Sequence, residues 1–173
     1  QEECGQDQLP REVEPGIMQF LIVADPHASL NPLGDTGLSI ARTSLERGHD
    51  VFWAEIGDVV LAGRGVVARS RQIESCAEGA LPEPRKASPD HRRIVDFDAV
   101  WIRKDPPFDW RYVSLCWLLA LEERDTTIIN RPSLVVRHHE KMLPFEAFRA
   151  GFLEADDIVP TTLLTDDASG GIP

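Results

Sequence analysis

The first stretch of apolar periodicity in this chain restricts the fold more than any other feature. Met18–Ala24 is a continuous apolar run, which is typical of a strand buried on both faces. Residues 35–47 then place apolar side chains on one face at helical spacing, and Gly48 follows as a helix stop. A second apolar strand, Val51–Trp53, comes next. Strand, helix and strand joined by short links predict a βαβ unit with parallel strands and a right-handed crossover.

The alternation of strands and helices continues along the chain. Further strands are expected at 59–61, 66–68, 97–102, 126–129 and 159–164, and further helices at 111–124, 132–136 and 143–152. The first two of these strands flank Ala62-Gly63-Arg64-Gly65 and predict a β-hairpin. Residues 74–93 are rich in Pro, Gly and charge, and we expect a long loop there. The pattern predicts an α/β fold with an open, mostly parallel sheet, flanking helices and a β-hairpin.

Composition excludes several classes of protein. The net charge of -11 argues against a nucleic-acid partner, because phosphate binding needs clustered Lys and Arg. No apolar window is long enough for a membrane helix, and no secretory signal pattern opens the chain. The cysteines Cys4, Cys76 and Cys116 are odd in number and widely spaced, so we expect neither a disulfide framework nor a metal site. These features favour a cytoplasmic protein, with Cys116 as a buried, inert thiol.

The segment Arg103-Lys104-Asp105-Pro106-Pro107-Phe108-Asp109 carries the densest chemistry in the sequence. It follows a buried strand, and ligands in open α/β sheets bind at the carboxyl ends of strands. The two prolines stiffen the backbone, which favours a preorganised site. Asp25-Pro26-His27 also follows a strand, so we expect both loops to edge one crevice. The alternative is a stiff turn in which Arg103 and Asp105 pair with neighbouring residues.

This segment resembles the Arg-Lys-Asp-Pro-Pro-Phe-Asp signature of bacterial glutathione synthetases, and other landmarks of that family stand in the same order. They are Asp25-Pro26, Glu55-Ile56-Gly57-Asp58, Ile129-Asn130-Arg131-Pro132 with Glu140-Lys141, and Val159-Pro160-Thr161-Thr162-Leu163-Leu164-Thr165. The resemblance covers about residues 19–166. The chain is therefore similar to the Rossmann-like, pre-ATP-grasp N-terminal domain of these enzymes.

The resemblance implies a domain layout and an activity. It implies the pre-ATP-grasp domain at 17–165 and a linker stub toward a missing ATP-grasp domain at 166–173. Residues 1–16 have no counterpart in the family, and we expect a mobile acidic extension there because they are polar, acidic and aperiodic. Members of the family ligate γ-glutamylcysteine and glycine while ATP is hydrolysed to ADP, with Mg²⁺ as cofactor. We expect this chain alone to be inactive, because no phosphate loop or late Mg²⁺ carboxylate set follows Thr165. Small-molecule substrates are the expected partners, and a homo-oligomer remains open.

The resemblance also implies roles for individual residues. Arg103 and Lys104 would lie beside the anionic peptide substrate, with Asp25 and Asp105 in the same substrate site. Lys141 would contact the nucleotide, with a solvated helix lysine as the alternative. None of these residues is expected to be a nucleophile, a base or a metal ligand. Their role is positioning and charge stabilisation.

Other residues with chemical potential have simpler interpretations. His27 is expected to be exposed, and the adjacent His138 and His139 point too far apart on a helix for a metal pair. Gly34-Asp35-Thr36-Gly37 lacks the ending of a phosphate loop, so Asp35 or Thr36 is expected to cap a helix. The tryptophans are expected mostly in the core, although Trp110 is a candidate for lining a cleft; the set is Trp53, Trp101, Trp110 and Trp117.

Two alternatives to the ligase domain stay open. The chain ends at Pro173, and it departs from the family pattern at His138, His139 and Pro144. A stand-alone, non-catalytic binding or interaction module that kept the fold would explain these features. A domain of a related ATP-grasp peptide ligase is the other alternative. The reading frame after Pro173 would discriminate, because an ATP-grasp continuation supports the enzyme.

Overall fold

A computed structural model describes residues 16–26 and 29–161 of the chain. The chain divides into two compact units, residues 1–134 and residues 135–173, and each is described by itself. The predicted extension before Gly16 and the predicted stub at 166–173 lie outside the described residues, as does His27. The expected domain bounds of 17–165 stay a prediction.

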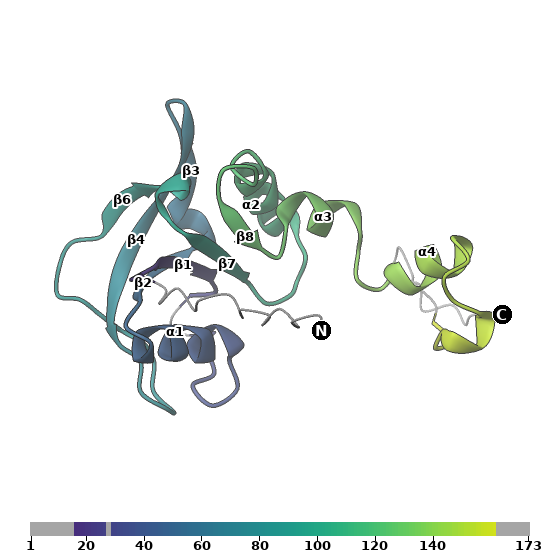
Figure 1. The fold of residues 1–173 in the computed structure, drawn as a ribbon, viewed down its shortest axis with the longest axis horizontal. Helices are drawn as coiled ribbons and strands as arrows, with labels where there is room; N and C mark the ends of the chain where they lie inside the picture. The colour runs from purple at the N-terminus through teal and green to yellow at the C-terminus, as the bar shows by residue number, and fades with distance from the viewer. Residues whose placement is uncertain (1–15, 27–28, 162–173) are drawn as a thin grey trace, which may run out of the picture. The chain divides into compact units, whose positions relative to one another are not determined.

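The first unit is built on one sheet with the strand order β3-β4-β2-β1-β7-β8 (Figure 1). The strands are β1 Gln19–Ala24, β2 Asp50–Glu55, β3 Val59–Ala62, β4 Gly65–Ser75, β7 Ala99–Arg103 and β8 Thr127–Ile129. The pairs β1–β2, β1–β7 and β7–β8 are parallel, while β2–β4 and β3–β4 are antiparallel. The predicted open, mostly parallel α/β sheet with a hairpin is confirmed.

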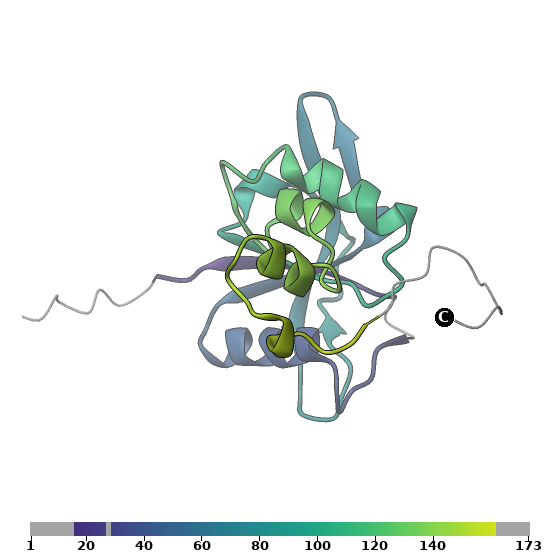
Figure 2. The ribbon, with the colours of Figure 1, turned by 90° about the vertical axis from the view of Figure 1, so that its right-hand side faces the viewer.

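The helices of this unit cover the two faces of the sheet. Helix α1 spans Thr36–Glu46 and helix α2 spans Trp110–Ala120, and Figures 1 and 2 show them on opposite sides of the parallel strands. Alternate residues of β1 therefore face different helices, and Ile22 packs in the α1-side cluster with Leu38 and Trp53. Leu21, Ile22 and Val23 have no exposed surface, as the apolar run predicts.

Polar residues set where both helices begin. The Asp35 carboxylate accepts hydrogen bonds from the N–H groups of Gly37 and Leu38 at the start of α1. Asp109 does the same for Arg111 and Tyr112 at the start of α2. These contacts satisfy amide donors that have no partner within the helix. The prediction that Asp35 or Thr36 caps a helix is confirmed, with Asp35 as the cap.

The expectation of an irregular loop at 74–93 is wrong in part. Strand β4 continues to Ser75, and the short strands β5 Glu83–Pro84 and β6 Asp90–Arg93 both pair with it. Nearly all residues of β5 and β6 are exposed, so neither strand has an apolar face that a sequence pattern can reveal. Backbone hydrogen bonds to a long neighbouring strand form them instead.

Two expectations for apolar segments need correction. Trp117 is 62% exposed on α2, because the helix buries only the face that carries Leu115, Cys116 and Leu119. Trp53 is buried and Trp101 half-buried, as expected for strand residues. Residues 159–161 form no strand, and the rest of the expected final strand lies outside the described residues.

Helix α3, Pro132–Arg137, crosses the boundary between the units. The second unit contains helix α4, Leu143–Arg149, with Pro144 in its first turn, where the missing N–H costs nothing. Throughout the described ranges, none of the helices has the length and apolar character needed to cross a membrane.

Candidate functional site

The carboxyl ends of β1 and β7 bring the two predicted loops together. In the parallel register Ala24 lies opposite Arg103, so Asp25 and Lys104 leave the sheet side by side. The Asp105 N–H donates to the Asp25 carboxylate at 2.7 Å, across 80 positions of sequence. The prediction that the Asp25 and Arg103 loops edge the same end of the sheet is confirmed.

Asp25 is the residue that joins these loops. One carboxylate oxygen accepts the Asp105 N–H, and the other lies 2.9 Å from the Lys104 ammonium. The side chains of Lys104 and Asp25 are only 15% and 17% exposed, so this ion pair is shielded from water. Lys104 also donates to the carbonyl oxygen of Asp105. Its charge is therefore balanced within the loops, and its contacts hold Asp25 and Asp105 in place.

Arg103 is held differently, across the start of α1. Its guanidinium donates to the Thr36 hydroxyl, and its aliphatic stem passes close to Gly37. A Cβ placed on Gly37 would lie 3.3 Å from the Arg103 Cβ, closer than the packing comfortably allows. The Arg103 Nε is buried and has no hydrogen-bond partner among the described residues. Among the described residues, no carboxylate lies within 4 Å of the Arg103 guanidinium, so its charge is not balanced by an ion pair.

Two adjacent prolines, Pro106 and Pro107, restrict the backbone in the rest of the loop. Phe108 packs against Tyr112 with ring centroids 4.9 Å apart, and Asp109 caps α2. The two aspartates therefore hold the loop at different points. The Asp105 backbone N–H bonds to Asp25, while the Asp109 side chain caps α2.

Thr36 and Tyr112 belong to this site, although the sequence marked Thr36 only as a possible helix cap and did not single out Tyr112. Burial raises the pKa of the Tyr112 hydroxyl, the neighbouring Cys116 raises it further, Arg103 lowers it, and Asp105 and Asp25 raise it. The phenol therefore stays protonated at neutral pH, within the electrostatic reach of the Arg103 loop. The position of Tyr112 could have marked it as a site residue, because this single tyrosine of the chain lies three residues after the capping Asp109.

The remaining predicted residues fall in the second unit. Lys141 pairs with its neighbour Glu140 at 3.1 Å, and both side chains are well exposed, at 64% and 76%. His138 Nδ1 lies 2.7 Å from a Glu146 carboxylate oxygen. Within residues 16–26 and 29–161, no three His, Cys, Asp or Glu side chains gather as a metal site would require. The nucleotide role of Lys141 stays a prediction.

The two described cysteines, Cys76 and Cys116, are buried free thiols. Cys116 is fully buried between α2 and the sheet, and burial raises its thiol pKa to about 11. Burial also raises the pKa of Cys76, which the positive charge of Arg42 lowers in part. The prediction of a buried thiol at Cys116 is confirmed, and Cys4 lies outside the described residues.

Comparison with known proteins identifies the family. The model of the prokaryotic glutathione synthetase N-terminal domain matches residues 18–136. The chain belongs to this family. Its matched range holds the strand ends and both loops of the site, with Asp25, Arg103, Lys104 and Asp105, whereas Lys141 lies beyond it.

Relatives that carry the name glutathione synthetase are similar over most of this chain. The protein of Prochlorococcus marinus subsp. pastoris is 32% identical over 143 residues, which cover 82% of this chain and 44% of the relative. That of Salmonella typhimurium is 30% identical over 150 residues, covering 86% of this chain and 45% of the relative. That of Ralstonia nicotianae is 28% identical over 152 residues, covering 87% and 44%. The chain thus spans less than half the length of these relatives.

Proposed function

We propose that this chain acts as the N-terminal, substrate-side domain of a glutathione synthetase, which ligates γ-glutamylcysteine to glycine and hydrolyses ATP to ADP. Membership of the family supports the proposal, as does the similarity to proteins named glutathione synthetase. ATP and Mg²⁺ serve the complete enzyme, and the matched half of the relatives supplies only one wall of its active site.

The observation that carries the proposal is the state of Arg103. It ends strand β7 at the carboxyl edge of the parallel strands, and it lacks a carboxylate partner there, whereas Lys104 has one. A guanidinium held in this way can bind a substrate carboxylate with two parallel hydrogen bonds. Arg103 therefore contacts the anionic peptide, while Asp25, Lys104 and Asp105 position the loop around it.

The remaining roles follow from the same proposal. Lys141 approaches the nucleotide, since its exposed pair with Glu140 is weak and readily exchanged for a phosphate. We also propose that the chain alone releases no phosphate from ATP, because the family model that it matches is that of the N-terminal domain. A cytoplasmic location is also proposed, on the grounds that buried, protonated thiols such as Cys116 suit a reducing compartment.

A chimaera tests the proposal. Residues 18–136 of this chain replace the matching residues of the Salmonella typhimurium relative, and glutathione formation is measured with γ-glutamylcysteine, glycine, ATP and Mg²⁺. We expect ligation by the chimaera and none by the chain alone. Arg103→Lys in the chimaera should raise the KM for γ-glutamylcysteine about tenfold or more, because a bidentate charged contact is lost.

The controls separate failure of chemistry from failure of folding. Arg85→Gln changes an arginine outside the loop, whose contact is with Gln72, and should leave the KM unchanged. Circular dichroism and a thermal melt establish that each protein is folded. A folded chimaera without ligase activity would contradict the proposal and favour the stand-alone binding module. An unchanged KM in Arg103→Lys would remove Arg103 from the substrate site.

A further inference from the structure

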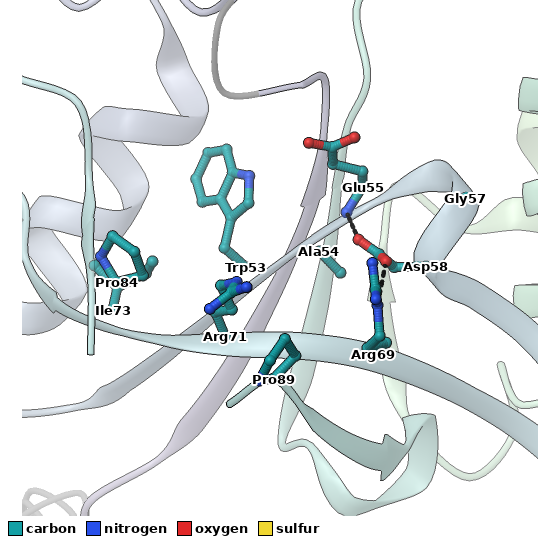
Figure 3. A pocket seen from close by; sticks show the side chains of 10 residues that line it. All are labelled: Trp53, Ala54, Glu55, Gly57, Asp58, Arg69, Arg71, Ile73, Pro84 and Pro89. Atoms are coloured by element: carbon teal, nitrogen blue, oxygen red, sulfur yellow. Dashed lines mark hydrogen bonds and ion pairs between the residues drawn. The ribbon is translucent and has the colours of Figure 1, made fainter. Parts of the chain in front are cut away.

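A pocket opens where β2 and β4 separate. These strands pair only at Phe52 with Gln72 and at Trp53 with Arg71. Beyond that point β2 ends at Glu55, while β4 continues toward β3 and β6. The space between them is a pocket of about 520 Å³, within the range of small-molecule sites (Figure 3). Neither Asp25 nor the Arg103 loop lines it, so it is separate from the site above.

An internal ion pair between Arg69 and Asp58 forms part of the pocket wall. The Arg69 Nε lies 2.9 Å from one oxygen of the Asp58 carboxylate, and the Glu55 N–H donates to the other oxygen at 3.1 Å. Figure 3 shows Asp58 between these two partners. Both oxygens of the Asp58 carboxylate have hydrogen-bond partners, and the charge of Arg69 is balanced by Asp58. These two side chains therefore form part of the pocket wall and are not available to bind a ligand.

Two charges in the pocket remain without an ion partner among the described residues, one of each sign. Arg71 makes only a long contact, 3.4 Å, with the carbonyl oxygen of Ala87, and Glu55 is exposed at the end of β2. Arg71 lies opposite Trp53 in the register, and Glu55 is two residues further along the same face of β2. Both side chains line this one pocket, where the two strands no longer pair. An arginine and a carboxylate can therefore both reach one ligand.

The rest of the wall is apolar. Trp53 and Ile73 are 7% and 4% exposed, Pro84 lies beside Ile73, and Pro89 also lines the pocket (Figure 3). The pocket thus combines one cation, one anion and an uncharged surface. It is complementary to a molecule that carries a carboxylate and an ammonium group close together, with an uncharged remainder.

We propose that this pocket binds a free α-amino acid with an uncharged side chain. The ligand carboxylate meets the Arg71 guanidinium, its ammonium group meets the Glu55 carboxylate, and its side chain packs against Trp53 and the two prolines. The site is additional to the substrate contacts of Arg103, and its existence does not depend on the ligase activity of the family.

The experiment uses the chain itself and L-leucine as the probe. Titration is followed by the indole N–H signals in a ¹⁵N-correlated NMR spectrum, where Trp53 reports on the pocket and Trp117 serves as an internal reference. We expect a saturable shift of Trp53. N-acetyl-L-leucine lacks the ammonium group and L-leucinamide lacks the carboxylate, so each should bind about tenfold or more weakly.

Variants make the test specific. Arg71→Gln and Glu55→Gln each remove one charge from an exposed position and should weaken L-leucine binding to a similar extent, with melting temperatures unchanged. Arg85→Gln, which lies outside the pocket lining, should bind as the wild type does. The proposal is overturned if Trp53 does not respond to L-leucine. It is overturned equally if the two blocked probes bind as well as L-leucine, or if both pocket variants retain full affinity.

Discussion

Replacement of Asp25 by alanine should loosen the carboxyl edge of the sheet. The side chain accepts the Asp105 N–H at 2.7 Å and pairs with Lys104 at 2.9 Å, and the side chains of this ion pair are less than a fifth exposed. A hydrogen bond that involves a charged group contributes about 1.5–3 kcal/mol, and removal of Asp25 also leaves Lys104 without its partner. We therefore expect a loss of about 2–3 kcal/mol in the free energy of unfolding.

Urea unfolding followed by tryptophan fluorescence measures this loss, and a thermal melt should fall by roughly 2–4 °C for each kcal/mol. Asp25→Asn separates the two contacts, because its carbonyl oxygen still accepts the Asp105 N–H but carries no charge for Lys104. It should cost less than Asp25→Ala. Lys104→Met completes a double-mutant cycle with Asp25→Asn, whose coupling energy should be at least about 0.5 kcal/mol.

Two results would contradict a stabilising role of Asp25. The first is that Asp25→Ala unfolds at the same urea concentration as the wild type, which would mean that the shielded pair adds no net stability. The second is that the costs of Asp25→Asn and Lys104→Met add without coupling, which would mean that the two side chains do not interact in solution.

Three further predictions concern groups outside the loops. Glu122→Ala should cost about 1–3 kcal/mol of unfolding free energy, because the buried N–H of Val66 would lose its 2.8 Å acceptor, whereas Glu122→Gln keeps an acceptor and should cost less in the same urea assay. Hydrogen bonds from Ser133, with help from Arg131, lower the pKa of Glu123 from about 4.5, so its stabilising contribution is present above that pH and lost as the pH falls through the lowered value. The excess melting temperature of the wild type over Glu123→Gln should accordingly shrink on acidification, and a constant difference would disprove the linkage. Cys116 should resist alkylation at about pH 8 in the folded chain and react in urea, as peptide mass spectrometry can establish; rapid labelling of the native chain would contradict its burial.

The βαβ unit and both helix caps were predictable because their signals are local. Apolar runs mark β1 and β2, and Asp35 stands directly before an amphipathic segment. The proximity of Asp25 and Asp105 followed from parallel topology alone. The choice of partners did not, since nothing in the sequence says that Lys104 rather than Arg103 pairs with Asp25.

Edge strands and pockets escaped prediction for a different reason. Strands β5 and β6 are held by backbone pairing with β4, which leaves no apolar alternation in their side chains. The pocket beside Arg71 exists because β4 leaves β2 after only two paired positions, and strand divergence has no sequence pattern of its own. Trp117 was misplaced because α2 is apolar almost all round, so composition did not reveal which face lies on the sheet.

Gly37 approaches Arg103 closely, so the absence of a side chain at position 37 helps to set the orientation of the Arg103 side chain. Any Cβ at position 37 would come within 2.9 Å of the Asp35 cap oxygen and 3.3 Å of the Arg103 Cβ, so the helix start and the arginine would compete for one volume. The orientation of the Arg103 side chain therefore depends partly on a residue that lies 66 positions earlier and has no functional group. Addition of a single methyl group at position 37, as in Gly37→Ala, would therefore redirect the Arg103 guanidinium although Arg103 itself is unchanged.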